Sequence, residues 1–573
     1  MSLRFQIIAG LIALVLLSST AFASDVVLST LQSELSRSVT NLGSASKKAP
    51  MFYLQYTVYD KSTFGLNCTD GGMNDPRQSH TRSFTVDLRV GSKSLDNTHE
   101  LRGSDNFRDN FEMPRDQAFP LDNDTLAMKL ALWNETEYRY QKAKERLTKV
   151  LTNKQVKVNE EDRADDFSDS SPQQYEEPIQ QSTLDTAKWH DIIKRTGVRL
   201  ASQPYVNSAT TVLNITNETE YIVNSDGAKI RQTHHYVVLS LQISGMADDG
   251  MDLQRMEQFS CYEPSGLPSE ETITAAADRI LAELKALKSA PIVEPYIGPA
   301  ILKNRASGVF FHEIFGHRIE GHRQKAANEG QTFTKKVNEQ ILPKFINVFD
   351  DPTRQKLGMT DLRGYYKYDD EGVPAQKVSV VEHGALKNFL TSRSPLKNFP
   401  ASNAHGRREE GYPIVSRQGN LMMVPDTSVP YSRLRDMLIE ECKKQDKPYG
   451  LIFDDIAGGF TMTRRQGPQA FKVLPLLVYR VYTDGRPDEI VRGVDIVGTP
   501  LTSFSKIIMA GNDPDVFNGT CGAESGMVPV SASSPSILVS EIEVEKRQKG
   551  QEKPPILPPP STNFGQPTTG KGM

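Results

Sequence analysis

Two histidines and a glutamate lie close together at residues 312–317, where the sequence reads His-Glu-Ile-Phe-Gly-His. Imidazole nitrogens bind zinc, and an adjacent carboxylate can take a proton from a water molecule on the metal. His312 and His317 are therefore candidate metal ligands, and Glu313 is a candidate general base. This combination predicts hydrolysis on a zinc ion. The alternative is a helix end at which the histidines have no chemical role.

The spacing of the two histidines does not fit a regular helix. The common zinc-protease motif places its histidines four residues apart, on one face of one helix. Five residues separate His312 from His317, which turns their side chains about 140° apart around an ideal helix. A shared metal ion therefore requires a local break or bulge. Gly316 immediately precedes the second histidine and is the residue best suited to allow it.

A cysteine far along the chain is a further candidate. Cys521 lies in the small-residue segment Asn-Gly-Thr-Cys-Gly and could be a metal thiolate, a free thiol or half of a disulfide. His322 follows the histidine motif and could be a further ligand, but it is interpreted as an exposed group or a neighbour of the ligands. The pairing of the remaining cysteines cannot be read from the sequence. They are Cys68, Cys261 and Cys442.

Periodic apolar residues predict the elements that must position these groups. The pattern favours a mixed α/β region at residues 24–290 and a β-rich domain at 291–545, so the predicted fold class is α+β. An apolar lead-in at 309–311 predicts that the histidine motif lies on a buried helix. Expected helices cover 28–42, 126–151 and 273–287, expected strands cover 52–59, 83–90, 237–243 and 537–544, and expected hairpins cover 377–390 and 474–492.

Three segments have compositions unlike a packed domain. Residues 1–23 have the pattern of a secretory signal peptide, with Arg4 before an apolar run and a small-x-small cleavage site; a retained anchor is the alternative. Residues 160–177 are acidic and lack apolar periodicity, so we expect a solvated, exposed loop. Residues 546–573 are rich in Pro, Gln and Lys and are expected to be disordered. The mature protein should be secreted or periplasmic, without a stable membrane span.

Length and charge exclude several classes of protein. The chain has 573 residues, with 67 Lys and Arg against 71 Asp and Glu, for a net charge of −4. Nucleic-acid binders are usually basic, so no nucleic-acid partner is expected. A hydrophobic content of 38% and a charged content of 24% are those of an ordinary globular protein.

The candidate residues resemble the TldD/PmbA family of metallopeptidases over residues 293–545. The N-terminal half matches that family only in length and style. Because the resemblance rests on several motifs in order, it is more specific than any single motif. The motifs are His312-Glu313 with His317, Ile319-Glu320-Gly321, Asp369-Asp370-Glu371-Gly372-Val373-Pro374, Glu382-His383-Gly384-Ala385-Leu386, Asn403-Ala404-His405-Gly406-Arg407-Arg408, Gly458-Gly459, Arg492-Gly493, and Asn518-Gly519 with Cys521-Gly522.

The resemblance implies a catalytic zinc centre. His312, His317 and Cys521 would be the ligands, and Glu313 would be the general base and later the proton donor to the leaving amine. Two imidazoles and one thiolate would leave one zinc position open for water. The family's substrates are peptides and unfolded segments. Its members form homodimers or heterodimers with a companion subunit, so the same partners are expected here.

Two further groups are candidates for binding substrate. The strands around Gly458 and Gly459 could form the edge to which an extended peptide adds as a new strand; the alternative is that these glycines only serve turns. His405 and Arg407 could bind a peptide carboxylate or stabilise an oxyanion; the alternative is a structural ion pair.

The sequence therefore predicts a zinc metallopeptidase that cuts peptides or unfolded segments with zinc-activated water. The alternative from another class is a non-hydrolytic peptide-binding or assembly protein with a structural zinc. Glu313 separates the two, because binding does not require a carboxylate beside a ligand and hydrolysis does.

Overall fold

The computed structural model describes residues 25–101, 115–156, 164–180, 182–326, 328–465 and 470–547. The predicted signal peptide and the predicted tail beyond residue 547 lie outside the described residues. Among the helices of the described ranges, none combines the length and the hydropathy needed to cross a lipid bilayer.

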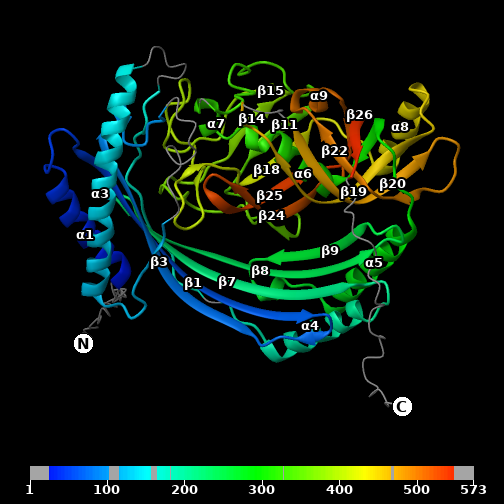
Figure 1. The fold of residues 1–573 in the computed structure, drawn as a ribbon, viewed down its shortest axis with the longest axis horizontal. Helices are drawn as coiled ribbons and strands as arrows, with labels where there is room; N and C mark the ends of the chain where they lie inside the picture. The colour runs from blue at the N-terminus through cyan, green and yellow to red at the C-terminus, as the bar shows by residue number, and fades with distance from the viewer. Residues whose placement is uncertain are drawn as a thin grey trace, which may run out of the picture.

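The N-terminal region is built on a nine-stranded sheet whose long strands curve beneath the rest of the molecule (Figure 1). Its strands follow the order β4-β3-β1-β7-β8-β6, with β2, β5 and β9 attached at the sides. The bounds are β1 Met51–Thr69, β2 Gly72–Met73, β3 Arg77–Ser92, β4 Leu95–Asp96, β5 Gln117–Ala118, β6 Gln174–Glu176, β7 Ser208–Asn224, β8 Lys229–Met246 and β9 Asp252–Cys261.

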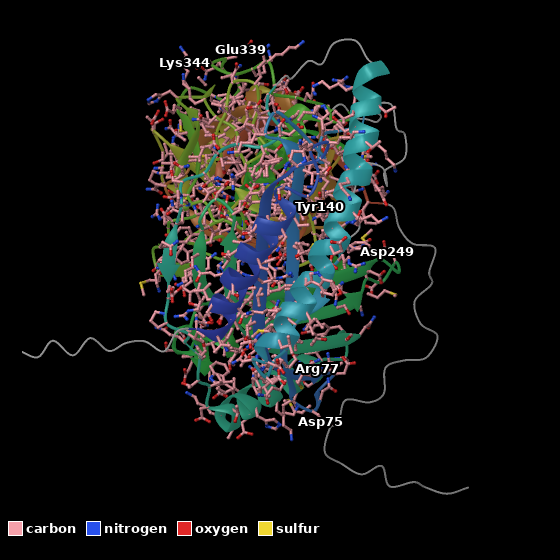
Figure 2. All side chains as sticks on the ribbon, turned by 90° about the vertical axis from the view of Figure 1, so that its left-hand side faces the viewer. Asp75, Arg77, Tyr140, Asp249, Glu339 and Lys344 are labelled. Atoms are coloured by element: carbon pink, nitrogen blue, oxygen red, sulfur yellow. The ribbon has the colours of Figure 1, made fainter. Side chains whose placement is uncertain are left out.

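Helices cover the two ends of this sheet and form separate apolar cores with it. Near one end, α1 (Val26–Leu42) and α3 (Thr125–Val156) pack on β1 and β3; near the other, α4 (Thr186–Ala201) and α5 (Glu270–Ser289) pack on β7, β8 and β9. Figure 2, viewed from the α3 side, shows this helix running along the sheet, with Tyr140 near its middle. Both α1 and α5 begin at a capping side chain, since Asp25 accepts a hydrogen bond from Leu28 N and Ser269 accepts one from Thr272 N.

The C-terminal region contains two larger sheets. One has seven strands in the order β10-β19-β20-β22-β26-β23, with β21 beside β20, and the other has six in the order β15-β14-β11-β18-β25-β24. The bounds of the first are β10 Tyr296–Leu302, β19 Tyr449–Thr461, β20 Phe471–Tyr482, β21 Glu489–Val491, β22 Val494–Gly498, β23 Ile507–Ala510 and β26 Ile537–Lys546. Those of the second are β11 Ile346–Asp350, β14 Val378–Glu382, β15 Ala385–Leu386, β18 Asn420–Pro425, β24 Asp515–Ala523 and β25 Gly526–Ser534.

Short elements complete this region. Two small hairpins are β12 Lys356–Leu357 with β13 Thr360–Asp361 and β16 Gly406–Arg407 with β17 Val415–Ser416. The helices are α6 Asn304–Ile314, α7 His322–Lys325, α8 Tyr431–Lys444 and α9 Pro500–Ser505, with the 3₁₀ turn η2 Gly316–Arg318; a further 3₁₀ turn, η1 Pro264–Gly266, lies in the N-terminal region between β9 and α5.

The helix α6 lies between the two C-terminal sheets. It contacts β19 and β20 of the seven-stranded sheet and β24 and β25 of the six-stranded sheet. Every residue from Ala306 to Ile314 is buried. A helix enclosed on all sides must be apolar around most of its circumference, which explains the Val309-Phe310-Phe311 lead-in. The histidine motif therefore lies at the end of a buried central helix, as expected.

The α+β fold class is confirmed, and most expected elements are present. The hairpin at 377–390 turns at His383 and Gly384, whose φ angles are 46° and 77°. Positive φ at both positions is the geometry of a two-residue hairpin turn. The strands expected at 52–59 and 83–90 are longer than the pattern indicated, because β3 begins with exposed polar residues at 77–81 and β1 continues through half-buried residues to the buried Leu66 and Cys68.

The expectation of an exposed acidic loop at residues 160–177 is wrong for part of that segment. Phe167 is 2% exposed, and Asp166 and Ser168 are also buried. The guanidinium groups of Arg89 and Arg393 each lie 4.0 Å from the centre of the Phe167 ring. Cation–π contacts on an otherwise polar segment therefore anchor it, although the sequence around it has no apolar period.

Polar side chains join the N-terminal sheet to the C-terminal region. Arg408 donates hydrogen bonds to the hydroxyls of Tyr59 and Thr57 and pairs with Asp87. Nearby, Gln55 Nε2 donates to the main-chain oxygen of Asp370. The two regions therefore contact each other through charged and polar groups as well as apolar ones.

Candidate metal centre

The helix that carries the histidine motif breaks between the two histidines. α6 ends at Ile314, Phe315 has φ −104°, and residues Gly316–Arg318 continue as a 3₁₀ turn. The break brings the ring centres of His312 and His317 to 5.1 Å. The local break that the five-residue spacing required is thus confirmed.

Gly316 allows this break through a close approach. A β-carbon at this position would overlap the side-chain amide of Gln418, which is 0% exposed. Gln418 therefore packs directly against the backbone of the broken turn. The requirement for glycine is steric, because Gly316 is not one of the described residues whose φ angle is positive.

The break, together with the β24–β25 hairpin, brings the three predicted ligands into one cluster. The potential ligand atoms of His312, His317 and Cys521 all lie within 4.8 Å of one another. Their exposed fractions are 7%, 6% and 4%. Nε2 of His317 lies 3.4 Å from Sγ of Cys521. In the part of the chain that the structure describes, this is the one group of His, Cys, Asp and Glu side chains with such geometry.

The residues present fit a metal ion. Nδ1 of His312 is buried and has no hydrogen-bond partner among the described residues. A buried polar atom without a partner lowers the stability of the fold, and a metal ion that accepts the lone pair of the nitrogen removes this penalty. Two imidazoles and a thiolate are a donor set for a transition metal such as zinc rather than for calcium or magnesium.

The charges around Cys521 favour the metal-binding form of its side chain. Burial alone would raise the pKa of this thiol. The imidazoles of His317 and His312 and the guanidinium of Arg417 lower the pKa by more than burial raises it, so it lies well below its usual value. The thiolate, not the thiol, is the metal ligand. The protein thus holds the sulfur ready to bind a cation.

A carboxylate behind His317 orients its ring. Oε2 of Glu320 lies 3.3 Å from Nδ1 of His317, and the Glu320 side chain is completely buried. Arg323 Nε donates to the same oxygen at 2.9 Å, and Arg417 Nε lies 3.5 Å from Oε1. An Nδ1–H bonded to Glu320 leaves Nε2 free to face Cys521. The sequence placed Glu320 in a motif without giving it this role.

Two arginines tie the ligand-bearing segments together. Arg417 donates to the main-chain oxygens of Cys521 and Gly526 at 2.6 and 2.9 Å. Arg323 donates from both Nη atoms to Glu524, in the same hairpin as Cys521. Because both arginines also contact Glu320, the histidine turn and the cysteine hairpin share one set of charged contacts. Sequence reasoning missed both arginines, since their partners lie far along the chain.

The candidate general base and one predicted substrate residue lie beside the cluster. Oε2 of Glu313 is 4.0 Å from Nε2 of His317, and the Glu313 side chain is 10% exposed. A β-carbon at Gly459 would lie 2.8 Å from Cγ of Glu313, so β19 passes directly against this carboxylate. At Gly458, φ is 152° and a β-carbon would meet no atom within 4 Å. The two glycines thus face opposite surroundings.

The structure does not present His405 and Arg407 to a ligand, contrary to the substrate-binding expectation. His405 is 0% exposed, with Nε2 3.3 Å from Asp350 and Nδ1 2.8 Å from the main-chain oxygen of Asn403. Arg407 donates from Nη1 to the main-chain oxygens of Gln418 and Pro529. The polar atoms of both side chains form contacts within the protein. These contacts support the alternative that the two residues have a structural role.

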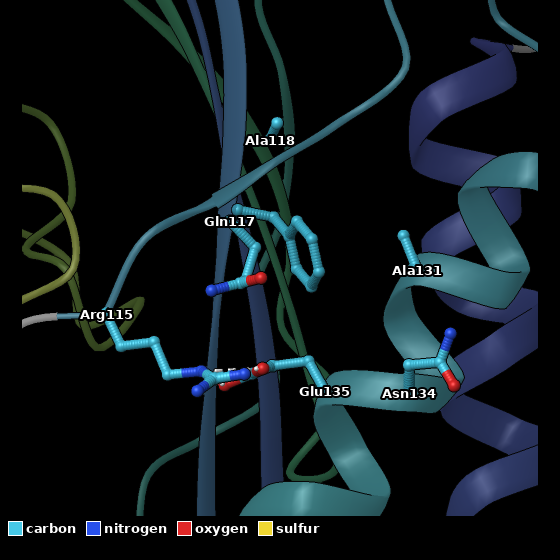
Figure 3. Close-up of a pocket in the computed structure, with 7 residues that line it drawn as sticks. Arg115, Gln117, Ala118, Ala131, Asn134 and Glu135 are labelled. Atoms are coloured by element: carbon cyan, nitrogen blue, oxygen red, sulfur yellow. Dashed lines mark hydrogen bonds and ion pairs between the residues drawn. The ribbon is translucent and has the colours of Figure 1, made fainter.

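The other cysteines and a surface cavity lie apart from these ligands. All four cysteines are buried and none forms a disulfide. A cavity of about 190 Å³ lies between β5 and α3 and is lined by the Arg115–Glu135 ion pair (Figure 3). Its lining contains none of the predicted site residues.

Comparison with known proteins assigns the C-terminal region. Residues 296–546 match the model of the PmbA/TldA metallopeptidase C-terminal domain. A metalloprotease of Archaeoglobus fulgidus is 31% identical over 240 residues, covering 42% of this chain and 51% of that protein. A zinc metalloprotease TldD homologue of Saccharolobus solfataricus is 28% identical over 269 residues, covering 46% and 54%. The chain spans about half the length of the curated relatives it matches.

Solved structures show the same fold over more of the chain. A protein of Thermotoga maritima described as a putative modulator of DNA gyrase superposes with a TM-score of 0.58 at 16% identity, covering 90% of this chain and 99% of that one. TldE of Thermococcus kodakarensis gives 0.56 at 13% identity, covering 90% and 100%. Residues 296–546 are thus similar to the C-terminal domain of the TldD/PmbA metallopeptidases.

Proposed function

We propose that this chain is a zinc-dependent peptidase that cuts peptides or unfolded polypeptide segments. The observation that carries the proposal is the buried convergence of His312, His317 and Cys521 beside the carboxylate of Glu313. These three side chains would hold a zinc ion, and a site with three protein ligands would leave room for water. The name of the Saccharolobus solfataricus relative supports zinc as the metal.

The residues around the metal have separate tasks in this proposal. When bound, zinc supplies a Lewis acid and lowers the pKa of a water molecule. Glu313 takes a proton from the attacking water and later gives it to the leaving amine. Glu320 holds the ring of His317 in one orientation, and Arg323 and Arg417 hold Glu320.

The substrate is proposed to add as a strand to β19 next to Glu313. Met462 N donates to Ala470 O, so Phe460 and Met462 bond toward β20, and the alternating residues Gly459 and Thr461 turn their N–H and C=O groups to the other side. Gly330 N donates to Thr463 O on that side, so an extended segment already pairs with the next part of the same edge.

Location and assembly belong to the proposal as well. The N-terminal sequence supports a secreted or periplasmic protein, and the family resemblance supports a homodimer or a heterodimer with a companion subunit. The alternative function is peptide binding without hydrolysis, with a structural metal. Glu313 distinguishes the two, because it touches β19 and the ligands without belonging to the ligand set.

The test compares wild type with Glu313→Ala on an unfolded polypeptide substrate. We expect the variant to retain its zinc and its melting temperature while its cleavage rate falls by about 10² to 10⁴, the usual contribution of a general base. Glu339→Ala, which removes a carboxylate that is 52% exposed, is the control and should cleave at the wild-type rate. Equal rates for wild type and Glu313→Ala, both zinc-loaded, would favour the binding protein.

A further inference from the structure

Two large apolar side chains stand exposed on the strand that passes the candidate general base. Phe460 is 53% exposed and Met462 is 48% exposed. Side chains alternate between the two faces of a strand, so Phe460 and Met462 share one face while Gly459 and Thr461 share the other. We call Phe460 and Met462 the apolar platform.

The two faces of this strand have different surroundings. On one face, Gly459 packs against Glu313, and Oγ1 of Thr461 accepts a hydrogen bond from Arg318. On the other face, the space beside Gly458 is open and the platform side chains are exposed. One face is therefore closed by the metal centre, and the other is available to a ligand.

The backbone between these faces lies at a gap in the sheet edge. β10 pairs with β19 up to Phe453, and residues 328–330 pair with the chain at 463–465. Between these pairings, Gly459 and Thr461 direct their backbone groups outward. In the described ranges, no main-chain partner from another element bonds to the N–H groups of these two residues. An extended peptide in this gap would continue the line of residues 328–330.

We infer that the apolar platform is a substrate subsite that selects extended peptides with apolar residues at alternate positions. Directly opposed side chains on neighbouring strands lie about 5 Å apart, so every second side chain of an added peptide would rest beside Phe460 or Met462. The intervening side chains would point to the Glu313 face. This pattern matches unfolded polypeptides, whose apolar segments are exposed.

The inference rests on the proposed peptidase function and is tested so that the two can fail separately. The probes are an unstructured peptide with Leu at every second position and the same peptide with Ser replacing each Leu. Wild type and the Phe460→Ser/Met462→Ser double variant are compared for the ratio of kcat/KM on the two peptides. Binding of both peptides to Glu313→Ala, with and without the double substitution, is measured by fluorescence anisotropy.

We expect wild type to prefer the Leu peptide by about fivefold, from two cross-strand contacts. In the double variant the ratio should fall to near one, and the same preference should appear and disappear in binding. Leu126→Ser and Met359→Ser, which remove side chains that are 67% and 92% exposed elsewhere, should keep the wild-type ratio.

Several results would overturn the inference. A wild-type preference that survives the double substitution, or no preference in cleavage and binding, would remove the platform from substrate selection. A double variant that becomes a smaller species in light scattering would show that the platform is instead a contact between two copies of the chain. No cleavage by zinc-loaded wild type, with the binding preference intact, would overturn the peptidase function and leave the subsite standing.

Discussion

Nε2 of His317 lies 3.4 Å from Sγ of Cys521, although 204 positions separate the two residues in the sequence. The histidine belongs to the 3₁₀ turn after α6, and the cysteine belongs to the β24–β25 hairpin. Both are buried, and both are held from behind by charged residues that do not enter the cluster. Such an arrangement is stabilised when one cation binds both side chains, and the predictions below follow from it.

The metal should depend on the cysteine. Cys521→Ala should lose most of a zinc content of about one per chain in wild type, because two imidazoles alone form an incomplete site. Metal analysis of the purified proteins by mass spectrometry measures this directly. Chelation should lower the melting temperature of wild type, since a ligand that binds only the native state stabilises it.

The control for this change is Cys442→Ala, which removes another fully buried thiol, on α8. It should retain zinc even if it is less stable. Equal zinc contents in wild type and Cys521→Ala would remove the cysteine from the ligand set.

Glu320 should tune the affinity of the metal centre. Replacing a carboxylate that orients a metal-bound histidine costs about 10- to 100-fold in metal affinity. We expect Glu320→Ala to lose more affinity than Glu320→Gln, because Gln keeps an acceptor for Nδ1 of His317. Competition with a chelator of known affinity measures the loss, and the absorption spectrum of the cobalt-substituted protein reports the altered ligand geometry.

Glu329→Gln is the matched control for Glu320. Glu329 is buried and pairs with the same Arg323 guanidinium, whereas the carboxylate that contacts Nδ1 of His317 is that of Glu320. If Glu329→Gln lowers metal affinity as much as Glu320→Gln, the effect arises from disturbing Arg323 and not from orienting the histidine.

The close approach at Gly316 should be specific to Gln418. Gly316→Ala forces the buried Gln418 amide to move, and we expect a loss of about 1–3 kcal/mol in the free energy of unfolding, as for other overpacked sites. Metal affinity should also fall, because the same turn positions His317. Denaturant unfolding and chelator competition measure the two effects.

A second substitution tests the mechanism. Gln418→Ala creates space at the same point, so the Gly316→Ala/Gln418→Ala double variant should be more stable than the sum of the two single changes predicts. Simple additivity would show that Gly316 is needed for a reason other than this contact.

The junction between the two regions should lose stability as the pH rises. Burial and the charge of Glu220 raise the pKa of Asp370 to about 7, against an opposing effect of Arg408 and Arg407. The native state therefore keeps a proton on Asp370 that the unfolded state releases near pH 4. The contribution of this protonation to the free energy of unfolding is complete below about pH 4 and is lost as the pH rises through 7.

Asp370→Asn removes this titration while keeping an oxygen that can accept the hydrogen bond from Arg408 N. The melting temperature of wild type minus that of Asp370→Asn should therefore decrease between pH 5 and pH 8. Asp75→Asn, at an exposed position, should show a constant difference from wild type. A difference for Asp370→Asn that stays constant or increases would contradict the raised pKa.

Much of the fold could be predicted because its signals are local. The caps of α1 and α5 and the turn at His383 and Gly384 depend on a few neighbouring residues, and each has the expected geometry. The break between His312 and His317 was also predictable, because two histidines at that spacing on an unbroken helix cannot bind the same metal ion. The placement of Cys521 beside them came from family resemblance, since no local rule connects residues so far apart.

The rest depends on partners that the sequence does not indicate. His405 and Arg407 have the residue types of a substrate site, but distant acceptors enclose both. Phe167 lies in an acidic segment, and its burial is explained by distant partners, the guanidinium groups of Arg89 and Arg393 and the ring of Tyr53. The arginines around Glu320 could not be identified for the same reason. Residue type predicts what a side chain can do, and long-range packing decides whether it is free to do it.

The order of the chain has a consequence for biosynthesis. β10 pairs with β26, and the last candidate ligand follows the second histidine by 204 positions. A ribosome that has just completed the histidine motif has therefore produced neither the thiol nor the strand that closes the seven-stranded sheet. Chains that stop before Cys521 would lack the third candidate ligand, so such fragments could not form the complete metal centre.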